Sequence, residues 1–243
     1  MDITDADITD AVVTGAASGI GRALATRLHG SGVRLVLADI DHDRLADVAT
    51  ELGATAVPTD VADPDAMAAL AAAAPATQLV CLNAGIVGSD LGPPWEVDAQ
   101  DWDRVFAVNV GGVVNGLRAF VPRLLASGHP AHVLITASLA GLAAFPGGGA
   151  YGASKHAVVG LAEQTALGLA GTAVGVTAMC PALVRSAMSP DGLDPADVAA
   201  TALAAVRDRR FAVVPPEWRD PVLLRWQRLV SGDAPIPPRP STS

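Results

Sequence analysis

Apolar stretches recur along the chain at intervals that predict strands alternating with helices. The strand-like stretches are short and rich in β-branched residues, and several are apolar at consecutive positions. They cover residues 11–14, 33–38, 54–58, 78–82, 131–136, 173–180 and 211–214, with alanine- and leucine-rich segments of helical period between them. Strands that are apolar on both faces are typical of a parallel sheet covered by helices on both sides. We therefore predict a doubly wound α/β fold with about seven strands.

No break in this pattern divides the chain, so we predict a single domain over residues 1–235. A chain of 243 residues is long enough to bury one sizeable core. The last residues, 236–243, have the sequence IPPRPSTS, which is rich in proline and has no apolar period. We expect this tail to be poorly ordered.

The composition limits the kinds of partner that we expect. A net charge of -9 argues against nucleic acid and anionic membranes, which both require a basic surface. The longest apolar run, AMAALAAAA at 66–74, is too short to cross a bilayer, and no basic and apolar leader opens the sequence. Cys81 and Cys180 lie in apolar runs typical of buried, reduced thiols. We therefore expect a cytoplasmic protein, and the histidines show no ligand spacing that would predict a metal site.

The segment TGAASGIG, residues 14–21, follows the first predicted strand and opens a helix. Its glycines would let the backbone turn sharply and approach a phosphate, while the free amides at the helix start would attract the anion. The spacing G-x3-G-x-G differs from that of the commonest dinucleotide fingerprint, so a tight turn without a ligand is the alternative.

Asp39 ends the second predicted strand, where dinucleotide-binding folds place a carboxylate that accepts hydrogen bonds from the adenosine ribose. A solvated strand end or a helix N-cap is the alternative for an isolated aspartate. Its carboxylate would repel the 2'-phosphate of NADP, and Ser18 and Ile40, which are best placed to offer a basic partner, are uncharged. The sequence therefore favours NAD, although Arg44 lies nearby.

The stretch YGASKHAVVG, residues 151–160, contains the only tyrosine and the only lysine of the chain. Tyr151 and Lys155 are four residues apart on a predicted helix over 150–170, so they lie on one face. A nearby ammonium stabilises a phenolate and lowers the pKa of tyrosine from about 10 toward neutrality. The pair predicts a general acid/base, and the alternative is a packing tyrosine beside a surface lysine. Ser138 ends the apolar strand HVLITAS, where its hydroxyl could orient a substrate oxygen.

In their order and spacing, TGAASGIG, NAG at 83–85, NVGG at 109–112, Ser138 and YGASK at 151–155 resemble the short-chain dehydrogenase/reductase family, in its subfamily of about 250 residues. The resemblance covers residues 8–215 and implies a Rossmann-like sheet. It implies that Ser138 binds the substrate oxygen, that Tyr151 transfers the proton, and that Lys155 tunes Tyr151 and holds the cofactor ribose. It also implies that Asn109 supports a water linking Lys155 to solvent, with an ordinary polar helix residue as the alternative.

The same resemblance implies two further sets of residues. The predicted cofactor contacts are Gly15, Ser18, Gly19, Ile20, Gly21, Asp39, Asp60, Val61, Asn83, Ala84, Gly85, Tyr151, Lys155, Pro181, Val184 and Ser186. The predicted substrate contacts are Ser138, Leu139, Phe145, Tyr151, Leu183 and Met188, and Ile86 and Val87 are expected nearby. Because most of this second set is apolar, we expect an apolar substrate.

The sequence departs from the family pattern at three places. Leu82 stands where an asparagine is usual, which we expect to weaken the tie between that strand and its neighbours. Ala182 replaces a glycine in PALVRS. Relatives often insert one or two helices as a lid after this segment, but here AMSPDGLD alone separates Ser186 from the next predicted helix. We therefore expect a site that is open or covered by another segment.

One candidate cover is the amphipathic stretch EWRDPVLLRWQRLV, residues 217–230. Packing against its own domain is the interpretation we favour, followed by a subunit contact or partial lid, and last by a helix on a membrane surface.

The sequence as a whole predicts a homodimer or homotetramer that transfers hydride between NAD(H) and an apolar secondary alcohol or ketone. The alternatives are an NADP-dependent carbonyl reductase and a non-catalytic dinucleotide-binding scaffold.

Overall fold

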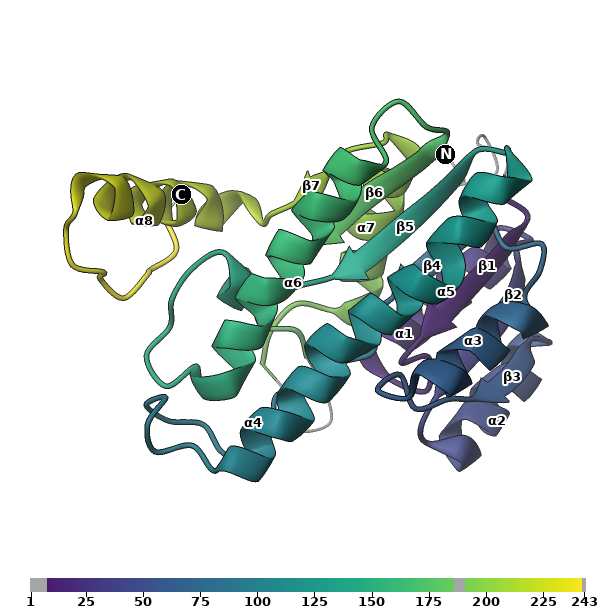
Figure 1. Ribbon diagram of the computed structural model, residues 1–243, viewed down its shortest axis with the longest axis horizontal. Helices are drawn as coiled ribbons and strands as arrows, with labels where there is room; N and C mark the ends of the chain where they lie inside the picture. The colour runs from purple at the N-terminus through teal and green to yellow at the C-terminus, as the bar shows by residue number, and fades with distance from the viewer. Residues whose placement is uncertain (1–7, 186–190, 242–243) are drawn as a thin grey trace.

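The computed structural model describes residues 8–185 and 191–241. Seven parallel strands form one sheet in the order β3-β2-β1-β4-β5-β6-β7, with helices on both faces (Figure 1). The strands are β1 (Asp10–Thr14), β2 (Arg34–Asp39), β3 (Thr55–Pro58), β4 (Leu79–Leu82), β5 (Ala131–Thr136), β6 (Val174–Met179) and β7 (Ala212–Val213). Each begins and ends within one residue of the range expected from the sequence. The predicted doubly wound α/β fold is confirmed.

The strand order reverses at β1, which pairs with β2 on one side and β4 on the other. Val13 lies opposite Leu37 of β2 and Cys81 of β4. The connections leaving β1 and β4 therefore run to opposite sides, and a crevice opens beyond the carboxyl ends of these two strands. This crevice is where an open α/β sheet places its ligand.

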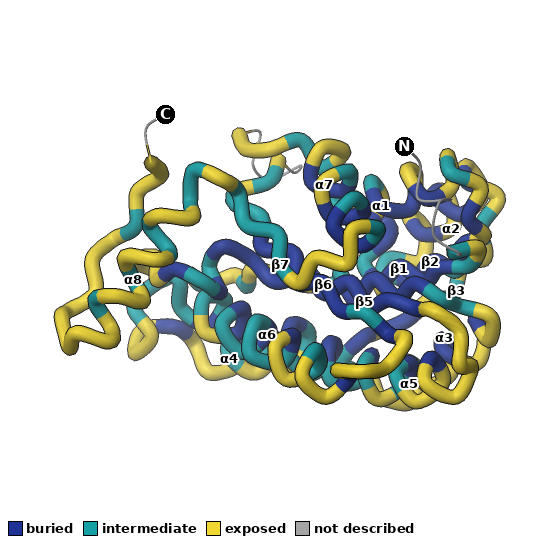
Figure 2. Tube along the Cα trace, turned by 90° about the horizontal axis from the view of Figure 1, so that it is seen from above, coloured by how far each residue is buried: buried dark blue, intermediate teal, exposed yellow. Residues whose placement is uncertain are grey.

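The helices form two layers around the sheet. They are α1 (Gly19–Gly30), α2 (His42–Leu52), α3 (Pro64–Ala73), α4 (Ala99–Phe106), α5 (Gly112–Ser127), α6 (Gly149–Gly168), α7 (Pro195–Arg207) and α8 (Arg219–Ser231). Figure 2 shows α1, α2 and α7 on one side of the strands and α3, α5 and α6 on the other. Each layer has its own apolar core, with Leu24, Leu45 and Leu203 in one and Met67 and Phe120 in the other.

Local sequence signals explain where these helices begin and end. Four of them begin after an aspartate whose carboxylate accepts a hydrogen bond from a backbone amide of the first turn, an arrangement that stabilises a helix start. These residues are Asp41, Asp63, Asp98 and Asp194. Three helices end at a glycine with a positive φ, which only glycine adopts without strain. These are Gly53, Gly128 and Gly232.

A π-helical turn, η2 (Ala107–Gly111), joins α4 to α5 into one continuous helical stretch, Ala99–Ser127. By length and composition this stretch is apolar enough to cross a membrane, with a mean hydropathy of 1.3 in its most apolar part. In this fold it packs against α3, α6 and β4. It therefore acts as a covering helix of the sheet, and its π-helical turn lies toward the crevice side, where it contacts α6.

The C-terminal segment projects from the sheet as an arm (Figure 1). It consists of a short turn, η4 (Pro216–Trp218), then α8, then a tail that returns along α8. None of the residues of α8 is buried, so the interpretation we favoured, packing against its own domain, is wrong for most of this helix. The tail, which we expected to be poorly ordered, lies along the arm as far as Ser241, whose amide donates to the Glu217 carbonyl at 2.8 Å.

Candidate active site

The glycine segment after β1 forms a tight turn that leads into α1. Gly15 has a φ of +66°, and a Cβ there would lie 2.8 Å from the Ala84 Cα, so no side chain fits. A Cβ at Gly21 would collide with the Gly15 carbonyl oxygen. Gly19 has a φ of +51° but nothing within 4 Å of its Cβ position, which leaves room beside the loop. The three glycines thus have different roles in one tight turn, and this geometry fits the phosphate contact that the sequence analysis expected.

The start of α1 is suited to an anion. Ser18 is the N-cap, yet among the described residues its side chain makes no capping hydrogen bond, and the first turn of the helix carries no acidic residue. The amides of this turn are therefore not masked by a side-chain cap, and the helix dipole favours negative charge there. These features fit the pyrophosphate of a dinucleotide.

Asp39 lies at the end of β2 with its carboxylate directed toward the glycine segment. Its Oδ2 accepts a hydrogen bond from the Ala17 amide at 2.9 Å, and its Oδ1 accepts one from the Asp41 amide at 3.0 Å. The N-cap of α2 is Asp41, so Asp39 is not the capping residue that the sequence left as an alternative. Arg44 pairs with Asp41 at 3.4 Å, which directs the nearby cation to another carboxylate. This geometry fits an adenosine ribose beside Asp39.

The turn after β3 contains Asp60 and Val61. Asp60 is exposed, and its carboxylate accepts a hydrogen bond from the Ala62 amide at 2.9 Å. Val61 is buried, and its carbonyl accepts a hydrogen bond from Asn115 Nδ2 at 3.0 Å. Asn115, which the sequence analysis did not assign, therefore holds this turn from α5. The adenine contacts of Asp60 and Val61 stay a prediction.

Asn83 connects three strands at the crevice. Its Nδ2 donates to the Thr14 carbonyl at 3.1 Å, and its Oδ1 accepts from Thr136 Oγ1 at 3.0 Å. The Thr14 hydroxyl also accepts the amides of Asn83 and Ala84 at 2.9 and 3.1 Å. Leu82 is buried and fills the space beside Gly116. Asn83 and the two threonines link β1, β4 and β5, and the weakening expected from Leu82 stays a prediction.

Ser138, Tyr151 and Lys155 come together beyond the end of β5. Lys155 Nζ donates to the Thr136 carbonyl at 3.0 Å and lies 5.8 Å from the centre of the Tyr151 ring. Ser138 is buried, and its hydroxyl accepts a hydrogen bond from the Ala140 amide at 3.1 Å. Lys155 is also buried, so the alternative of a surface lysine is wrong. The end of one strand and the first two turns of α6 therefore present a hydroxyl, a phenol and an amine to the same place.

Burial shifts the ionisation of this group of side chains. It lowers the pKa of Lys155 to about 8, because the ammonium loses contact with water. Burial also raises the pKa of Tyr151, and a hydrogen bond with Ser138 opposes that rise. We expected Lys155 to lower the pKa of Tyr151, but in this structure the pKa of Tyr151 is raised, because burial outweighs the Ser138 hydrogen bond. The phenol is therefore protonated at neutral pH, a form that can donate a proton.

Asn109 lies in the π-helical turn and is fully enclosed by hydrogen-bond partners. Its Oδ1 accepts the Ile86 amide at 2.8 Å, and its Nδ2 donates to the Ile86 carbonyl and to Ser154 Oγ, both at 2.9 Å. Ser154 in turn donates to the Tyr151 carbonyl at 2.8 Å. Asn109 is thus more than an ordinary polar helix residue, because it ties the segment after β4 to the turn that carries Tyr151. The water that it was expected to support stays a prediction.

Gly85 lies where these groups converge. A Cβ at this position would lie 3.1 Å from Asn109 Oδ1 and 3.4 Å from Lys155 Nζ. Thr14, Thr136 and Ser154, like Asn115, are supporting residues that the sequence analysis missed. A threonine at the end of each of two central strands, and a serine inside YGASK, were the available signals.

The expected substrate contacts are distributed unevenly. Leu139 is buried, and its amide donates to the Pro181 carbonyl at 2.9 Å, so it anchors the segment after Ser138. Phe145 and Leu183 are exposed, at 36% and 61%. Ser186 and Met188 lie outside the described residues. Two of the expected apolar contacts are thus solvent-exposed, and the role of each stays a prediction.

The segment after β6 is described on both sides of residues 186–190. Val184 forms an isolated bridge with Leu193, and the Leu193 amide donates to the Leu183 carbonyl at 2.9 Å. Arg185 forms an ion pair with Asp194, the N-cap of α7. The described parts of this segment therefore return directly to α7.

Neither cysteine takes part in this chemistry. Cys81 and Cys180 are free and buried, and burial raises the pKa of each thiol to about 12. Within residues 8–185 and 191–241, no cluster of His, Cys, Asp and Glu side chains could hold a metal ion. The remaining side chains of the site, a hydroxyl, a phenol and an amine, are suited to proton transfer.

Comparison with known proteins agrees with this geometry. The family model for short chain dehydrogenases matches residues 9–194. The 1-deoxy-11-beta-hydroxypentalenate dehydrogenase of Streptomyces exfoliatus is 44% identical over 73% of this chain and 68% of its own length. The 2-(R)-hydroxypropyl-CoM dehydrogenase of Xanthobacter autotrophicus is 38% identical over 83% of this chain and 84% of its own.

Solved structures show the same relationship. A short chain dehydrogenase/reductase from Burkholderia phymatum, solved in complex with NAD, superposes with a TM-score of 0.89 at 36% identity and covers 96% of this chain and 98% of its own. The apo form of LigD from a Sphingobium strain has a TM-score of 0.84 at 31% identity, over 95% and 99% of the two chains. The matched family model, these relatives and the site geometry together place the chain in the short-chain dehydrogenase/reductase family, as an oxidoreductase that acts on CH-OH groups.

Proposed function

We propose that the protein transfers a hydride between NAD(H) and an apolar secondary alcohol or its ketone. The observation that carries this proposal is the convergence of Ser138, Tyr151 and Lys155 at the crevice whose opposite side holds Asp39 and the glycine segment. A bound nicotinamide supplies the hydride to the carbonyl carbon in reduction, or accepts it in oxidation. The proton transfer and the orientation of the substrate are carried out by side chains of the protein.

In ketone reduction, the carbonyl oxygen becomes an alcohol oxygen and needs one proton. Tyr151 donates this proton from its phenol as the carbon accepts the hydride, and the Ser138 hydroxyl hydrogen-bonds the same oxygen and orients it. Lys155 carries its charge at neutral pH, since its pKa is about 8, and it stabilises the phenolate that remains. In alcohol oxidation Tyr151 takes the proton back, so the same three residues serve both directions.

NAD rather than NADP is favoured by the position of Asp39. A 2'-phosphate bound there would meet a carboxylate, while the nearby Arg44 is paired with Asp41. The Burkholderia relative was solved with NAD, which agrees with this proposal. An apolar substrate is favoured by the exposed side chains of Phe145 and Leu183.

The deciding experiment follows nicotinamide absorbance in the purified full chain, with NAD and NADP in parallel against a panel of apolar secondary alcohols and their ketones. We expect turnover with NAD at a kcat/KM at least tenfold above that with NADP. A preference for NADP would support the carbonyl reductase alternative instead. Cofactor binding with no turnover on any panel member would favour the non-catalytic scaffold.

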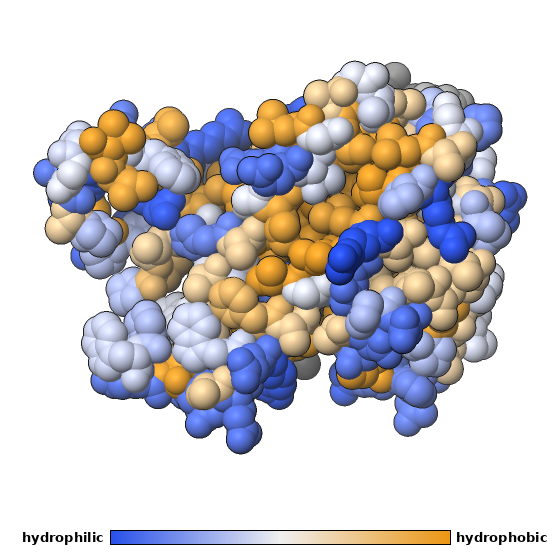
Figure 3. Space-filling model, viewed as in Figure 1, coloured by the Kyte–Doolittle hydropathy of each residue, from blue (hydrophilic) through white to orange (hydrophobic). Residues whose placement is uncertain are grey.

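We also propose that the protein forms a homodimer or homotetramer through α5 and α6. Figure 3 shows apolar side chains gathered over these helices on one face of the molecule. Half-buried apolar residues of this face include Leu117 and Val121 on α5 and Val159 and Leu161 on α6. A continuous apolar face of this kind is typical of a subunit contact.

A further inference from the structure

The C-terminal arm, defined as residues 216–241, contacts the rest of the chain at one functionally placed segment. The Arg225 guanidinium donates to the Leu142 carbonyl at 3.2 Å, and the Trp218 ring meets the Phe145 ring edge-on with 5.7 Å between centres. Leu142 and Phe145 belong to the twelve-residue connection between Ser138 and Tyr151, which we call the catalytic connection (residues 139–150). The arm therefore touches the segment that joins two of the predicted catalytic residues.

The two halves of the catalytic connection are held differently. The first half is anchored by the core, because the Leu139 amide bonds the Pro181 carbonyl and Gly141 lies directly against the Lys155 backbone. The second half contains three consecutive glycines at 147–149, and Gly147 and Gly149 have φ values of +73° and +43°. Glycine-rich backbone of this kind has little conformational restraint of its own. Gly149 is held against Val97, whereas residues 144–147 are exposed, so the position of this outer part depends on contacts from other segments.

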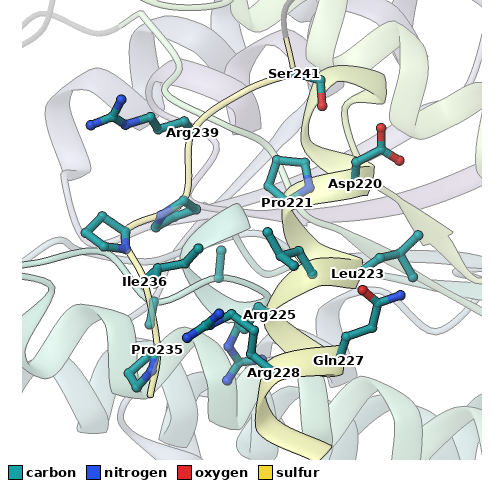
Figure 4. Close-up of a pocket in the computed structure, with 15 residues that line it drawn as sticks. Asp220, Pro221, Leu223, Arg225, Gln227, Arg228, Pro235, Ile236, Arg239 and Ser241 are labelled. Atoms are coloured by element: carbon teal, nitrogen blue, oxygen red, sulfur yellow. The ribbon is translucent and has the colours of Figure 1, made fainter. Parts of the chain in front are cut away.

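The arm is built to supply those contacts. Arg225 stacks on the Trp226 ring at 4.7 Å, which limits the positions that its guanidinium can take. The tail closes the arm on itself through the Ser241 amide and through Arg228 Nε, which donates to the Ala234 carbonyl at 2.9 Å. Between α8 and the tail a groove of about 750 Å³ opens onto Ala143 and Ala144 of the catalytic connection (Figure 4). The arm is thus held together by its own hydrogen bonds, and it contacts residues 142–145.

We infer that Trp218 and Arg225 are positioning residues that hold residues 142–145 in place and so set the size of substrate that the site accepts. This inference rests on the proposed function, because it assigns Phe145 to the substrate side of Tyr151. The Trp218 ring fixes the Phe145 ring from outside, and the Arg225 hydrogen bond fixes the backbone three residues earlier.

The test compares three variants of the full chain with wild type. Trp218→Ala removes the aromatic pair, Trp218→Phe keeps a ring in its place, and Leu229→Ala changes a side chain of α8 that is 59% exposed. An aromatic pair contributes roughly two- to tenfold to an equilibrium. We expect Trp218→Ala to raise KM for bulky apolar ketones by roughly this factor and to change the ratio of kcat/KM between bulky and small ketones. The affinity for NAD, the pH profile and kcat at saturation should stay close to wild type.

A second measurement does not depend on turnover. Hydrogen exchange of backbone amides in residues 139–150 should become roughly two- to tenfold faster in Trp218→Ala, remain near wild type in Trp218→Phe, and be unchanged in Leu229→Ala. Arg225→Met, which keeps the aliphatic stem, should also speed exchange there, and it provides a second variant if Trp218→Ala folds poorly.

Equal exchange and equal substrate ratios in Trp218→Ala, Arg225→Met and Leu229→Ala would overturn the inference. If wild type turns over no secondary alcohol or ketone, the proposed function and the size-selecting role fall together. The exchange data would still show whether the arm holds the catalytic connection.

Discussion

Tyr151 and Lys155 are both buried, and burial acts on each in the direction of its neutral form. The pKa of Lys155 falls to about 8 and that of Tyr151 rises above its usual value. At neutral pH the amine is still mostly charged and the phenol is protonated. The pair is therefore prepared to donate a proton to a ketone, and accepting one from an alcohol requires more alkaline conditions.

We predict that the two directions of the reaction depend on pH with opposite signs. Oxidation needs the Tyr151 phenolate, so its kcat/KM should rise as pH increases above neutral, whereas reduction should decline above about pH 8 as Lys155 loses its proton and with it the charge that stabilises the phenolate. Initial rates in both directions across this range test the prediction.

Tyr151→Phe should reduce both rates by roughly 100- to 10,000-fold while NAD affinity stays near wild type. Substantial turnover by this variant would contradict the proposed proton path.

Asp39 gives a second prediction at this scale. Asp39→Ala removes the ribose acceptor and the charge that opposes a 2'-phosphate, so the preference for NAD over NADP should shrink by at least tenfold. The measurement is kcat/KM for each cofactor at a fixed alcohol concentration. Asp60→Ala, in the exposed turn after β3, is the matched control and should leave the cofactor ratio unchanged. An unaltered ratio in Asp39→Ala would remove the main argument for NAD.

At the scale of elements, a buried histidine links β5, β6 and the segment before β7. His132 Nε2 lies 2.8 Å from Thr177 Oγ1, and that hydroxyl donates to the Arg210 carbonyl at 2.7 Å. Because the hydroxyl has one proton to donate, it accepts from His132, which therefore carries its proton on Nε2. Burial and, secondarily, the charge of Arg209 lower the pKa of His132 to about 4. The imidazole is neutral in the folded protein.

We predict that this histidine makes the fold sensitive to mild acid. Between pH 6.5 and about pH 4 the unfolded chain binds a proton that the folded chain excludes, so the free energy of unfolding falls with pH by about 3 kcal/mol in total. The lowered pKa values of Asp10 and Asp101 add a loss only below about pH 3.8. Urea unfolding across this window measures the slope. His132→Gln keeps a donor without the titration and should flatten it, and a slope equal to that of wild type would assign the effect to another group.

At the scale of the whole molecule, two apolar surfaces compete as subunit contacts. One is the face of α5 and α6, and the other is α8, on which Leu223, Leu229 and Val230 are all more than half exposed. We predict that light scattering gives a multiple of 24.5 kDa for wild type. Leu117→Glu on α5 should reduce that mass, because a buried charge destabilises an apolar contact. Leu223→Glu on α8 is the matched control, and a reduction confined to this variant would place the interface on the arm.

Local patterns in the sequence determined the strands, the helices and the principal motifs of this protein. Two-sided apolar runs specify buried strands, aspartates and glycines mark helix ends, and YGASK places Tyr151 and Lys155 on one helical face. All of these signals act between residues close in the chain, and that is why they could be predicted.

The tertiary structure decided what depends on contacts between distant segments. Asn83 joins Thr14 and Thr136, which lie 69 and 53 residues away, and Arg225 reaches Leu142 across 83 residues. No periodicity or spacing encodes such pairings, because they arise when separate elements pack together. The rise in the pKa of Tyr151 has the same origin, since desolvation depends on everything that surrounds the ring. The sequence alone thus determined which groups could do the chemistry, and the packing of distant segments decided their neighbours and their charge.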